Sequence, residues 1–385
     1  MRVRILFAMV AAAAAVHLAA CGPRAVHTPA LSPALEIAGL ELLGHYSLVP
    51  VDRLRSARPG GVSGLAVDPT TKEIIGISDD HPDNRVFIFE MSKPGMPFQV
   101  DLRAYFPLSI GPGAPPEQDS EGIALTRSGH MFISSEGLPR LEPRVQPAIV
   151  EYTRRVDYVG RLTIPSKFLQ PASGPLNHGV RENEGFESLT LTPDEGRLFT
   201  ASETSLAQDD ERPTFDQGTT ARMLELVSEG GQFVARREFP YPLGPVPRVA
   251  FTPRFMINGL VELLALSDTE FLSMERGYAE EAGDNGRRAT FIKIFRVSLD
   301  DATDISGMES IRGRAGLKPV RKRLLLDVNA VKGLPPELDV PAFDNFEGMC
   351  FGPTLPDGSR TLIIVSDDNF SPRERTWFLL FRIIK

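Results

Sequence analysis

The sequence contains very little cysteine: Cys21 and Cys350 are the only two among 385 residues, too few for a disulfide framework. It also has no block of basic residues, and 42 Lys and Arg against 50 Asp and Glu give a formal net charge of −8. This balance argues against a nucleic acid as partner. It favours cations instead, or substrates that are held through cations.

The common catalytic motifs are missing as well. No G-x-S-x-G string is present, and the nearest string, Gly61-Val62-Ser63-Gly64, has the wrong spacing for a nucleophile elbow. There is no H-E-x-x-H, no P-loop and no group of Cys and His residues at zinc spacing. Any hydrolysis would therefore most naturally be metal-assisted, with a carboxylate or a histidine orienting water.

Long apolar runs are scarce, and the only one lies at the start of the chain. Residues 5–20 are apolar and Ala-rich, follow two arginines, and are short for a membrane span. The run ends in Leu18-Ala19-Ala20-Cys21, which looks like a bacterial lipobox. We therefore expect residues 1–20 to be a lipoprotein signal peptide and Cys21 to carry the lipid. An ordinary signal peptide cut near the same place is the alternative.

Residues 21–40 are rich in Pro and Ala without periodicity, and we expect them to form a flexible tether. The lipid anchor would place the protein on the periplasmic side of a bacterial cell envelope. Gly22, rather than Asp, follows the cysteine, which favours the outer membrane. We expect membrane contact through this anchor only, and a monomer.

One sequence pattern recurs through the rest of the chain. It consists of an apolar run, a turn, a second apolar run and an acidic end. The last copy is the clearest, with runs at residues 346–351 and 361–367 around the turn Pro356-Asp357-Gly358. This pattern predicts a β-hairpin. Four more copies lie at residues 62–80, 120–136, 186–203 and 261–275, and in the copy at 261–275 Glu262 and Glu275 take the acidic positions. In an antiparallel hairpin the start of one strand and the end of the next share an edge, so the acids should meet at one rim.

Five copies of one hairpin indicate a repeat architecture. Further strand-like runs, such as residues 85–89 and 291–297, follow the hairpins and give three or four antiparallel strands per repeat, as in propeller blades. Strands left over at both chain ends, near residues 40–51 and 377–384, are what ring closure requires. We predict an all-β fold with a β-propeller over residues 41–385. Five blades are favoured, and six are the alternative, with a degenerate blade near residues 321–328.

Several short motifs stand at these hairpins: Ser120-Glu121-Gly122, Asn345-Phe346-Glu347-Gly348, Phe186-Glu187-Ser188-Leu189, Ala201-Ser202-Glu203, Glu275-Arg276 and Ser366-Asp367-Asp368-Asn369-Phe370. With these motifs the chain resembles the bacterial phytase-like domain family, often labelled "esterase-like activity of phytase". The resemblance covers roughly residues 45–385. It implies a secreted or lipid-anchored β-propeller with a hydrolase role. It carries over no catalytic residues, which stay unknown.

The acidic ends of the hairpins should gather around one mouth of the central channel. So many carboxylates repel one another unless a cation compensates them, and Ca²⁺ takes about 6–8 oxygen ligands. We predict that Glu121, Glu187 and Glu347 bind calcium, because they hold the same place in three copies. The next candidates are Glu203, Asp367 and Asp368. The alternative for each glutamate is a structural role, in which it accepts backbone N–H bonds from the neighbouring blade.

Arginines near the acids could bind the anionic part of a substrate, and we predict this role for Arg276 and Arg373. Three functions follow from these features. The first is a calcium-assisted hydrolase of small phosphate or carboxylic esters. The second is a non-catalytic binding or scaffold propeller, and the third is a lactonase-like enzyme that acts on sugar acids. The fold cannot decide among them, because propellers host many functions.

The lipobox gives the first testable prediction. Replacing Cys21 with Ser removes the thiol that would carry the lipid, so Cys21→Ser should release the protein from the membrane fraction or block its processing. Fractionation followed by a high-salt wash measures this. If the variant stays with the membranes after the wash, Cys21 is not the anchor.

Overall fold

The structure is a computed structural model that describes residues 35–48, 60–81, 83–94, 96–109, 111, 113–114, 117–283, 286–338 and 343–385. The chain divides into two units, and every described residue belongs to the second, Pro33–Lys385. The predicted signal peptide, Cys21 and the tether up to residue 34 lie outside the described residues. Among the helices that are described, none is long and apolar enough to span a membrane.

Twenty strands form five antiparallel sheets of four strands, and only short 3₁₀ turns interrupt them within the described residues. Blade 1 holds β2 (Val62–Val67), β3 (Ile74–Ser78), β4 (Arg85–Met91) and β5 (Val100–Pro107), and blade 2 holds β6 (Ser120–Leu125), β7 (His130–Ser135), β8 (Ala148–Thr153) and β9 (Tyr158–Arg161). Blade 3 holds β10 (Phe186–Leu191), β11 (Arg197–Ser202), β12 (Thr219–Glu229) and β13 (Gln232–Leu243), and blade 4 holds β14 (Pro253–Ala265), β15 (Glu270–Glu281), β16 (Arg288–Ser298) and β17 (Arg321–Asp327). Blade 5 holds β18 (Asn345–Phe351), β19 (Thr361–Asp367), β20 (Trp377–Ile384) and β1 (Gly39–Ser47).

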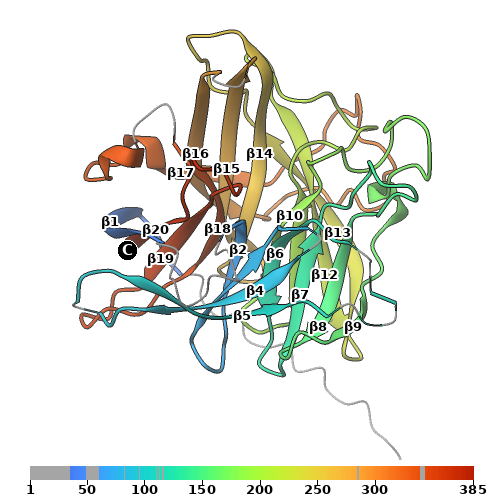
Figure 1. The fold of residues 1–385 in the computed structure, drawn as a ribbon. Helices are drawn as coiled ribbons and strands as arrows, with labels where there is room; N and C mark the ends of the chain where they lie inside the picture. Colours follow the sequence, from blue (N-terminus) through green and yellow to red (C-terminus); the bar gives the residue numbers. More distant parts are fainter. Residues whose placement is uncertain are drawn as a thin grey trace, which may run out of the picture. The chain divides into compact units, whose positions relative to one another are not determined.

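The five sheets stand in a ring, with the first strand of each blade at the centre (Figure 1). Each of β2, β6, β10 and β14 contacts the first strand of the next blade, and β18 contacts β2 to complete the circle. Five clusters of buried apolar residues lie between the sheets, one at each of the five blade interfaces. The predicted five-bladed propeller is therefore confirmed, and all five predicted hairpins are the first two strands of a blade.

The segment near residues 321–328 is β17, the fourth strand of blade 4, so the alternative of a sixth blade is wrong. The long spacing between the last repeats comes instead from longer strands and from long connections at residues 203–218, 299–320 and 328–344. β14, β15 and β16 have 13, 12 and 11 residues, whereas β2, β6 and β10 have six each. These three strands rise above the others in the upper part of Figure 1.

A glycine stands near the start of several first strands because neighbouring strands approach too closely for a side chain there. A Cβ atom at Gly64 would lie 2.3 Å from the carbonyl oxygen of Glu121. A Cβ atom at Gly122 would lie 2.5 Å from the backbone nitrogen of Leu189. The glycine of the recurring Glu-Gly motif is thus required by strand packing around the channel.

Blade 5 closes the ring with strands from both ends of the chain. β20 pairs with β19 on one side and with β1 on the other, from Gly39 opposite Ile384 to Ser47 opposite Trp377. Phe378 in β20 is fully buried, and its ring packs edge-on against Phe89 of blade 1 with the centroids 5.2 Å apart. The predicted terminal strands therefore join the first and last parts of the chain in one sheet. Cys350 is buried in the same interface, as a small apolar residue.

This packing makes Phe378 a test of ring closure. Phe378→Ala should lower the free energy of unfolding by about 3–5 kcal/mol, because it removes a buried ring and leaves a cavity between blades 5 and 1. Phe106 is the control, because its side chain in β5 is 46% exposed and Phe106→Ala should change stability by less than about 1 kcal/mol. Chemical denaturation measures both variants. Equal effects of the two substitutions would show that the closing interface adds little stability.

Candidate functional site

The first strand of every blade carries a β-bulge at the same level of the ring. The pairing of β2, β10, β14 and β18 with their second strands skips one residue each: Ser63, Glu187, Val261 and Glu347. In β6 the pairing with β7 skips two residues, Glu121 and Gly122. A bulge re-aims the side chain of the unpaired residue, so these positions form one ring of side chains at a mouth of the channel.

A second ring of side chains comes from the ends of the second strands. The residues that oppose the start of each bulge are Ser78, Ser135, Ser202, Glu275 and Ser366. The next residue along the chain belongs to the mouth in each blade, and these residues are Asp79, Glu136, Glu203, Arg276 and Asp367. Four blades thus place a carboxylate here, and blade 4 places an arginine.

The predicted alignment of the fourth hairpin is therefore wrong by one residue. Its mouth positions are Val261 and Arg276, not Glu262 and Glu275. The buried Glu262 accepts hydrogen bonds from the backbone of Leu263 (2.9 Å) and of Met349 in β18 (3.3 Å). Glu262 thus ties blade 4 to blade 5, which is the structural role foreseen as the alternative for such glutamates.

Arg276 neutralises one side of the mouth. Its Nη2 donates to Glu203 Oε1 at 3.0 Å, and its Nη1 donates to Glu347 Oε1 and to Asn345 Oδ1. The Glu203 side chain is fully buried, and the side chains of Glu347 and Arg276 are only 8% and 11% exposed. Two predicted calcium ligands are therefore ion-paired with the arginine that was predicted to bind an anion. A buried pair of this kind is costly to break, because each partner would be left as an uncompensated charge.

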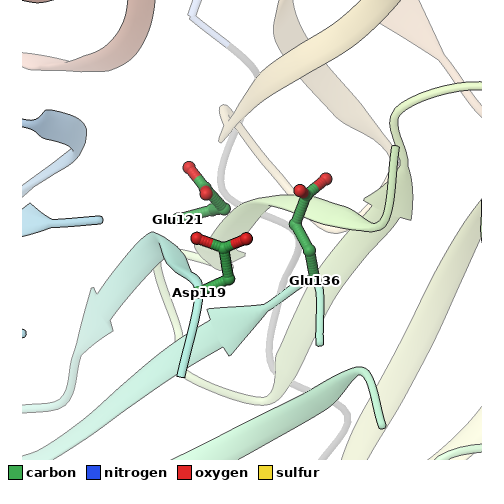
Figure 2. A group of neighbouring side chains, drawn as sticks. All are labelled: Asp119, Glu121 and Glu136. Atoms are coloured by element: carbon green, nitrogen blue, oxygen red, sulfur yellow. The ribbon is translucent and has the colours of Figure 1, made fainter. Parts of the chain in front are cut away.

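The opposite side of the mouth holds carboxylates without such a partner. Asp119, Glu121 and Glu136 each place an oxygen within 4.8 Å of the others, and so do Glu136, Glu187 and Glu203 (Figure 2 shows the first group). Glu136 Oε1 accepts the backbone N–H of Gly185 at 2.5 Å. Within the described part of the chain, no lysine or arginine forms an ion pair with Asp119, Glu121, Glu136 or Glu187.

Burial and mutual repulsion raise the pKa values of this group. Burial, followed by the charges of Asp119 and Glu136, raises the pKa of Glu121 well above its ordinary value. Burial, followed by the charges of Glu136 and Glu121, does the same for the pKa of Glu187. Burial raises the pKa of Asp119 to about 6, although the nearby His81 opposes the shift. It raises the pKa of Glu203 to about 7 against the opposing charge of Arg276.

The two remaining predicted ligands differ from each other. Asp368 Oδ1 accepts the backbone N–H groups of Gly61 and Phe370, both at 3.0 Å, so this side chain joins blade 5 to the start of blade 1. Burial and the charge of Asp79 raise the pKa of Asp367, which places Asp367 in the crowded group. Asp368 is thus held by the backbone, whereas Asp367 lies among the repelling carboxylates.

A cleft of about 1090 Å³ opens beside the mouth, and both predicted substrate-binding arginines line it. Glu203, Arg276 and Asn345 border the cleft where it meets the acidic group, and Arg373 borders it from the loop after β19. Its wall is formed by residues of the long strands β14–β16. The structure thus brings Arg276 and Arg373, which are far apart in the sequence, to one hollow.

Sequence reasoning missed Asp119 as a member of the acidic group. Asp119 stands two residues before Glu121, and this spacing is the only local signal for it, because the other copies have Gly or Asn there. Of the two loop histidines, His81 lies near enough to Asp119 to lower its pKa. His178 contacts the backbone oxygen of Leu169 (3.1 Å) and Glu309 (2.9 Å), so its ring has partners on both nitrogens.

Comparison with known proteins gives one family. The model of the family described as "Phytase-like: Esterase-like activity of phytase" matches residues 57–370. None of the curated proteins compared with the chain matches it.

Solved structures with a similar backbone include the catalytic domain of the Coprinopsis cinerea GH62 alpha-L-arabinofuranosidase (10% identity, 90% of this chain and 98% of that one, TM-score 0.42). A glycosyl hydrolase from Bacteroides ovatus matches with 10% identity over 90% of this chain and 94% of that one, at a TM-score of 0.34. A glucose dehydrogenase matches with 14% identity over 85% and 83%, at a TM-score of 0.31. At such TM-scores these likenesses do not bear on the activity.

The acidic group predicts an unusual dependence of stability on pH. A carboxyl group whose pKa is raised in the folded state holds a proton that the unfolded chain has already lost. With chelator present, the free energy of unfolding should therefore fall as the pH rises from about 4 to about 7, by about 1.4 kcal/mol for each unit of pKa shift. Denaturation curves across this range measure the slope.

Glu187→Gln should flatten this slope, because it removes one of the repelling carboxylates while keeping the shape of the side chain. Glu90 is a suitable control, because it lies on the surface in an ion pair with Arg103, and Glu90→Gln should leave the slope of the wild type. A wild-type protein that becomes steadily more stable over the same range would contradict the raised pKa values.

Proposed function

The chain belongs to the phytase-like family, and from that premise we propose that it is a calcium-assisted hydrolase of phosphate or carboxylic esters. The proposal takes the mouth of the propeller as the active site and the cleft beside it as the place of the substrate. The observation that carries it is a group of close carboxylates that form no ion pair with a lysine or arginine of the described residues: the buried Glu121, Glu136 and Glu187, and the half-buried Asp119.

A divalent cation suits this set because carboxylate oxygens are the ligands that calcium prefers, and because the ion would replace the protons that the group otherwise has to keep. We place the ion at Glu136, which both close groups share, with Asp119 and Glu121 on one side of it and Glu187 on the other. We give Glu347 and Asp368 no part in this ion site, since Arg276 already bonds to one oxygen of Glu347 and two backbone N–H groups bond to one oxygen of Asp368. A bound calcium ion would polarise the phosphoryl or acyl oxygen of the substrate.

The residues of the chain itself would bind and orient the substrate and move a proton. Arg276 fixes Glu203 through its Oε1, and the other oxygen, Oε2, is buried without a hydrogen-bond partner beside the cleft. With a pKa of about 7, Glu203 can give or accept a proton near neutral pH. We therefore assign Glu203 to proton transfer rather than to the metal.

For its location, we propose that the protein is lipid-anchored through Cys21 on the periplasmic side of a bacterial envelope, with the outer membrane preferred. The support for this is the lipobox at residues 18–21 and the Pro- and Ala-rich stretch that follows it. A tether of this kind would let the propeller meet small substrates in the surrounding solution.

A non-catalytic binding propeller is the second candidate, and Glu262 favours it. That buried carboxylate accepts hydrogen bonds from backbone groups of blades 4 and 5, and so it holds the two blades together. If the acidic group acts in the same way, its cation would stiffen the ring without turnover.

Calcium should stabilise the protein and switch on hydrolysis. An ion that binds only the folded state adds about 2.7 kcal/mol of stability at a hundredfold excess over its Kd, so the melting temperature should rise with calcium and fall with chelator. Hydrolysis of 4-nitrophenyl phosphate or 4-nitrophenyl butyrate should follow the same dependence. Thermal unfolding and release of 4-nitrophenol measure the two effects.

Variants distinguish the residues that bind calcium from those that do not. Glu121→Gln and Glu187→Gln should each lose most of the calcium response, whereas the surface control Glu90→Gln should keep it. Hydrolysis that continues undiminished in chelator would exclude calcium as the electrophile. A full calcium response in melting temperature with neither ester hydrolysed would support the binding propeller instead.

A further inference from the structure

Blade 4 is built differently from the other four at the mouth of the channel. In β2 and β10 a single residue, Val62 or Phe186, precedes the bulge, whereas residues 253–260 of β14 precede it. These extra residues pair with residues 275–281 of β15, so the hairpin continues past the mouth (Figure 1). The overhang forms one wall of the cleft of about 1090 Å³.

The face of the overhang that borders the cleft is apolar and aromatic. Phe255 and Ile257 stand two residues apart in β14, so their side chains lie on the same side of the sheet. Tyr278 of β15 pairs opposite Ile257 and shares that side. All three line the cleft, and the ring of Phe255 is 43% exposed, 6.3 Å from the ring of Tyr278. Large apolar rings left uncovered in a hollow indicate a surface for a ligand.

Aromatic side chains from other segments enclose the same space. Phe251 precedes β14, Phe291 belongs to β16, and Phe343 precedes β18, and all three line the cleft. Small-molecule sites in proteins are commonly hollows of about this size with apolar and aromatic walls. Rings that face the hollow from three segments suit a flat ring held among them.

The arginines that line the cleft do not make it an anion site, because none of them is free. Arg254 donates to Glu280 at 2.8 Å, and Arg288 donates to Glu374 at 2.7 Å. The other ion pairs are those of Arg248 with Asp216, Arg287 with Glu281, and Arg276 with Glu203 and Glu347. Arg373 has a partner as well. An anion that entered the cleft would therefore lose its hydration without meeting an unpaired positive charge.

The end of the cleft nearest the acidic group is polar. Arg276 and Glu203 border it there, and Glu203 is fully buried. Arg276 Nε and Glu203 Oε2 are buried polar atoms that have no hydrogen-bond partner within the described residues. Unpartnered atoms of this kind are rare in native proteins. One is a donor and the other belongs to a carboxyl group, so this end suits a neutral polar group such as an amide or an ester.

We propose that this cleft is a binding subsite for an uncharged aromatic group, with the ring against Phe255 and Tyr278 and a neutral polar group at Arg276 and Glu203. As the part of the substrate that it would hold, the subsite rests on the proposed function and deepens it: the preferred esters carry an uncharged aromatic group. Its binding chemistry is independent of turnover and of calcium, so it can be tested by itself.

The test compares two ligands that differ in charge and hardly in shape, neutral 2-naphthamide and anionic 2-naphthoate. Equilibrium dialysis of the full chain in chelator should give a Kd for 2-naphthamide at least about tenfold lower than that for 2-naphthoate, because only the anion has to give up the hydration of a charge. Acetamide at the same concentration should not displace 2-naphthamide, because it lacks the ring. Equal or tighter binding of 2-naphthoate, displacement by acetamide, or no binding of 2-naphthamide overturns the proposal.

A substitution in the aromatic wall locates the binding. Phe255→Ser should weaken 2-naphthamide about tenfold, because it removes one of the two rings against which the ligand packs. Phe106→Ser, which changes a similarly exposed ring on β5, should leave the Kd unchanged. An unchanged Kd in the Phe255 variant, or the same loss in the Phe106 control, overturns the assignment to this cleft.

A second substitution tests the role of the ion pairs. Glu280 accepts from Arg254 and also lies 3.3 Å from Arg288, so Glu280→Gln leaves positive charge uncompensated at the cleft. The variant should bind 2-naphthoate about fivefold more tightly than the wild type and 2-naphthamide equally well. If 2-naphthoate gains nothing, the paired carboxylates are not what keeps anions out of the cleft, and the inference of an uncharged ligand is overturned.

The outcome is separable from that of the proposed function. Binding of 2-naphthamide at Phe255 without hydrolysis of any ester would keep the subsite and reject the enzyme. Calcium-dependent hydrolysis without a preference for 2-naphthamide over 2-naphthoate would keep the enzyme and reject the subsite.

Discussion

Repulsion among buried carboxylates is the constraint that governs the centre of this protein. A closed ring of five blades brings the bulge of every first strand and the end of every second strand to one mouth, whatever their charges. Blade 4 relieves part of the repulsion, because it places Arg276 where the other four blades have an acid, and Val261 where three of them have a glutamate. The ion pairs of Arg276 with Glu203 and Glu347 then divide the mouth into a neutralised side and an acidic side.

That division also bears on the proposed chemistry. On the neutralised side the arginine bonds to one oxygen of Glu203, and the other oxygen is buried without a hydrogen-bond partner. On the acidic side the carboxylates must hold protons or share a cation. In the proposed function, proton transfer and metal binding therefore occupy neighbouring parts of one mouth, because one basic residue separates them.

The architecture could be predicted from the sequence because local signals repeat. Apolar runs around turns, such as the one at Pro356-Asp357-Gly358, mark each hairpin without reference to the rest of the chain, and five copies imply a ring. The leftover strands at the two ends implied the closing sheet for the same reason. Most acids of the mouth could be predicted from their fixed place in the repeat.

The rest depended on contacts between distant residues. The fourth hairpin was aligned wrongly because Glu262 and Glu275 lie one residue from the positions that hold acids in the other copies. Only the strand pairing shows that a bulge shifts the register by one residue. The pairing of Arg276 with Glu347 joins two blades and has no local signal. The cleft could not be predicted because it depends on the length of strands β14–β16. The irregular spacing of the repeats does not reveal these lengths.

The closing sheet has a consequence for how the molecule is made. Of the described strands, β1 is made first and β20 last, yet β1 has no pairing partner in its sheet except β20. Until β20 has been made, the growing chain carries four blades with an open gap, and the unpaired edges of β1 and β19 can pair with other chains. The mouth, which needs Asp79 from blade 1 beside Asp367 from blade 5, is complete only once β19 has been made.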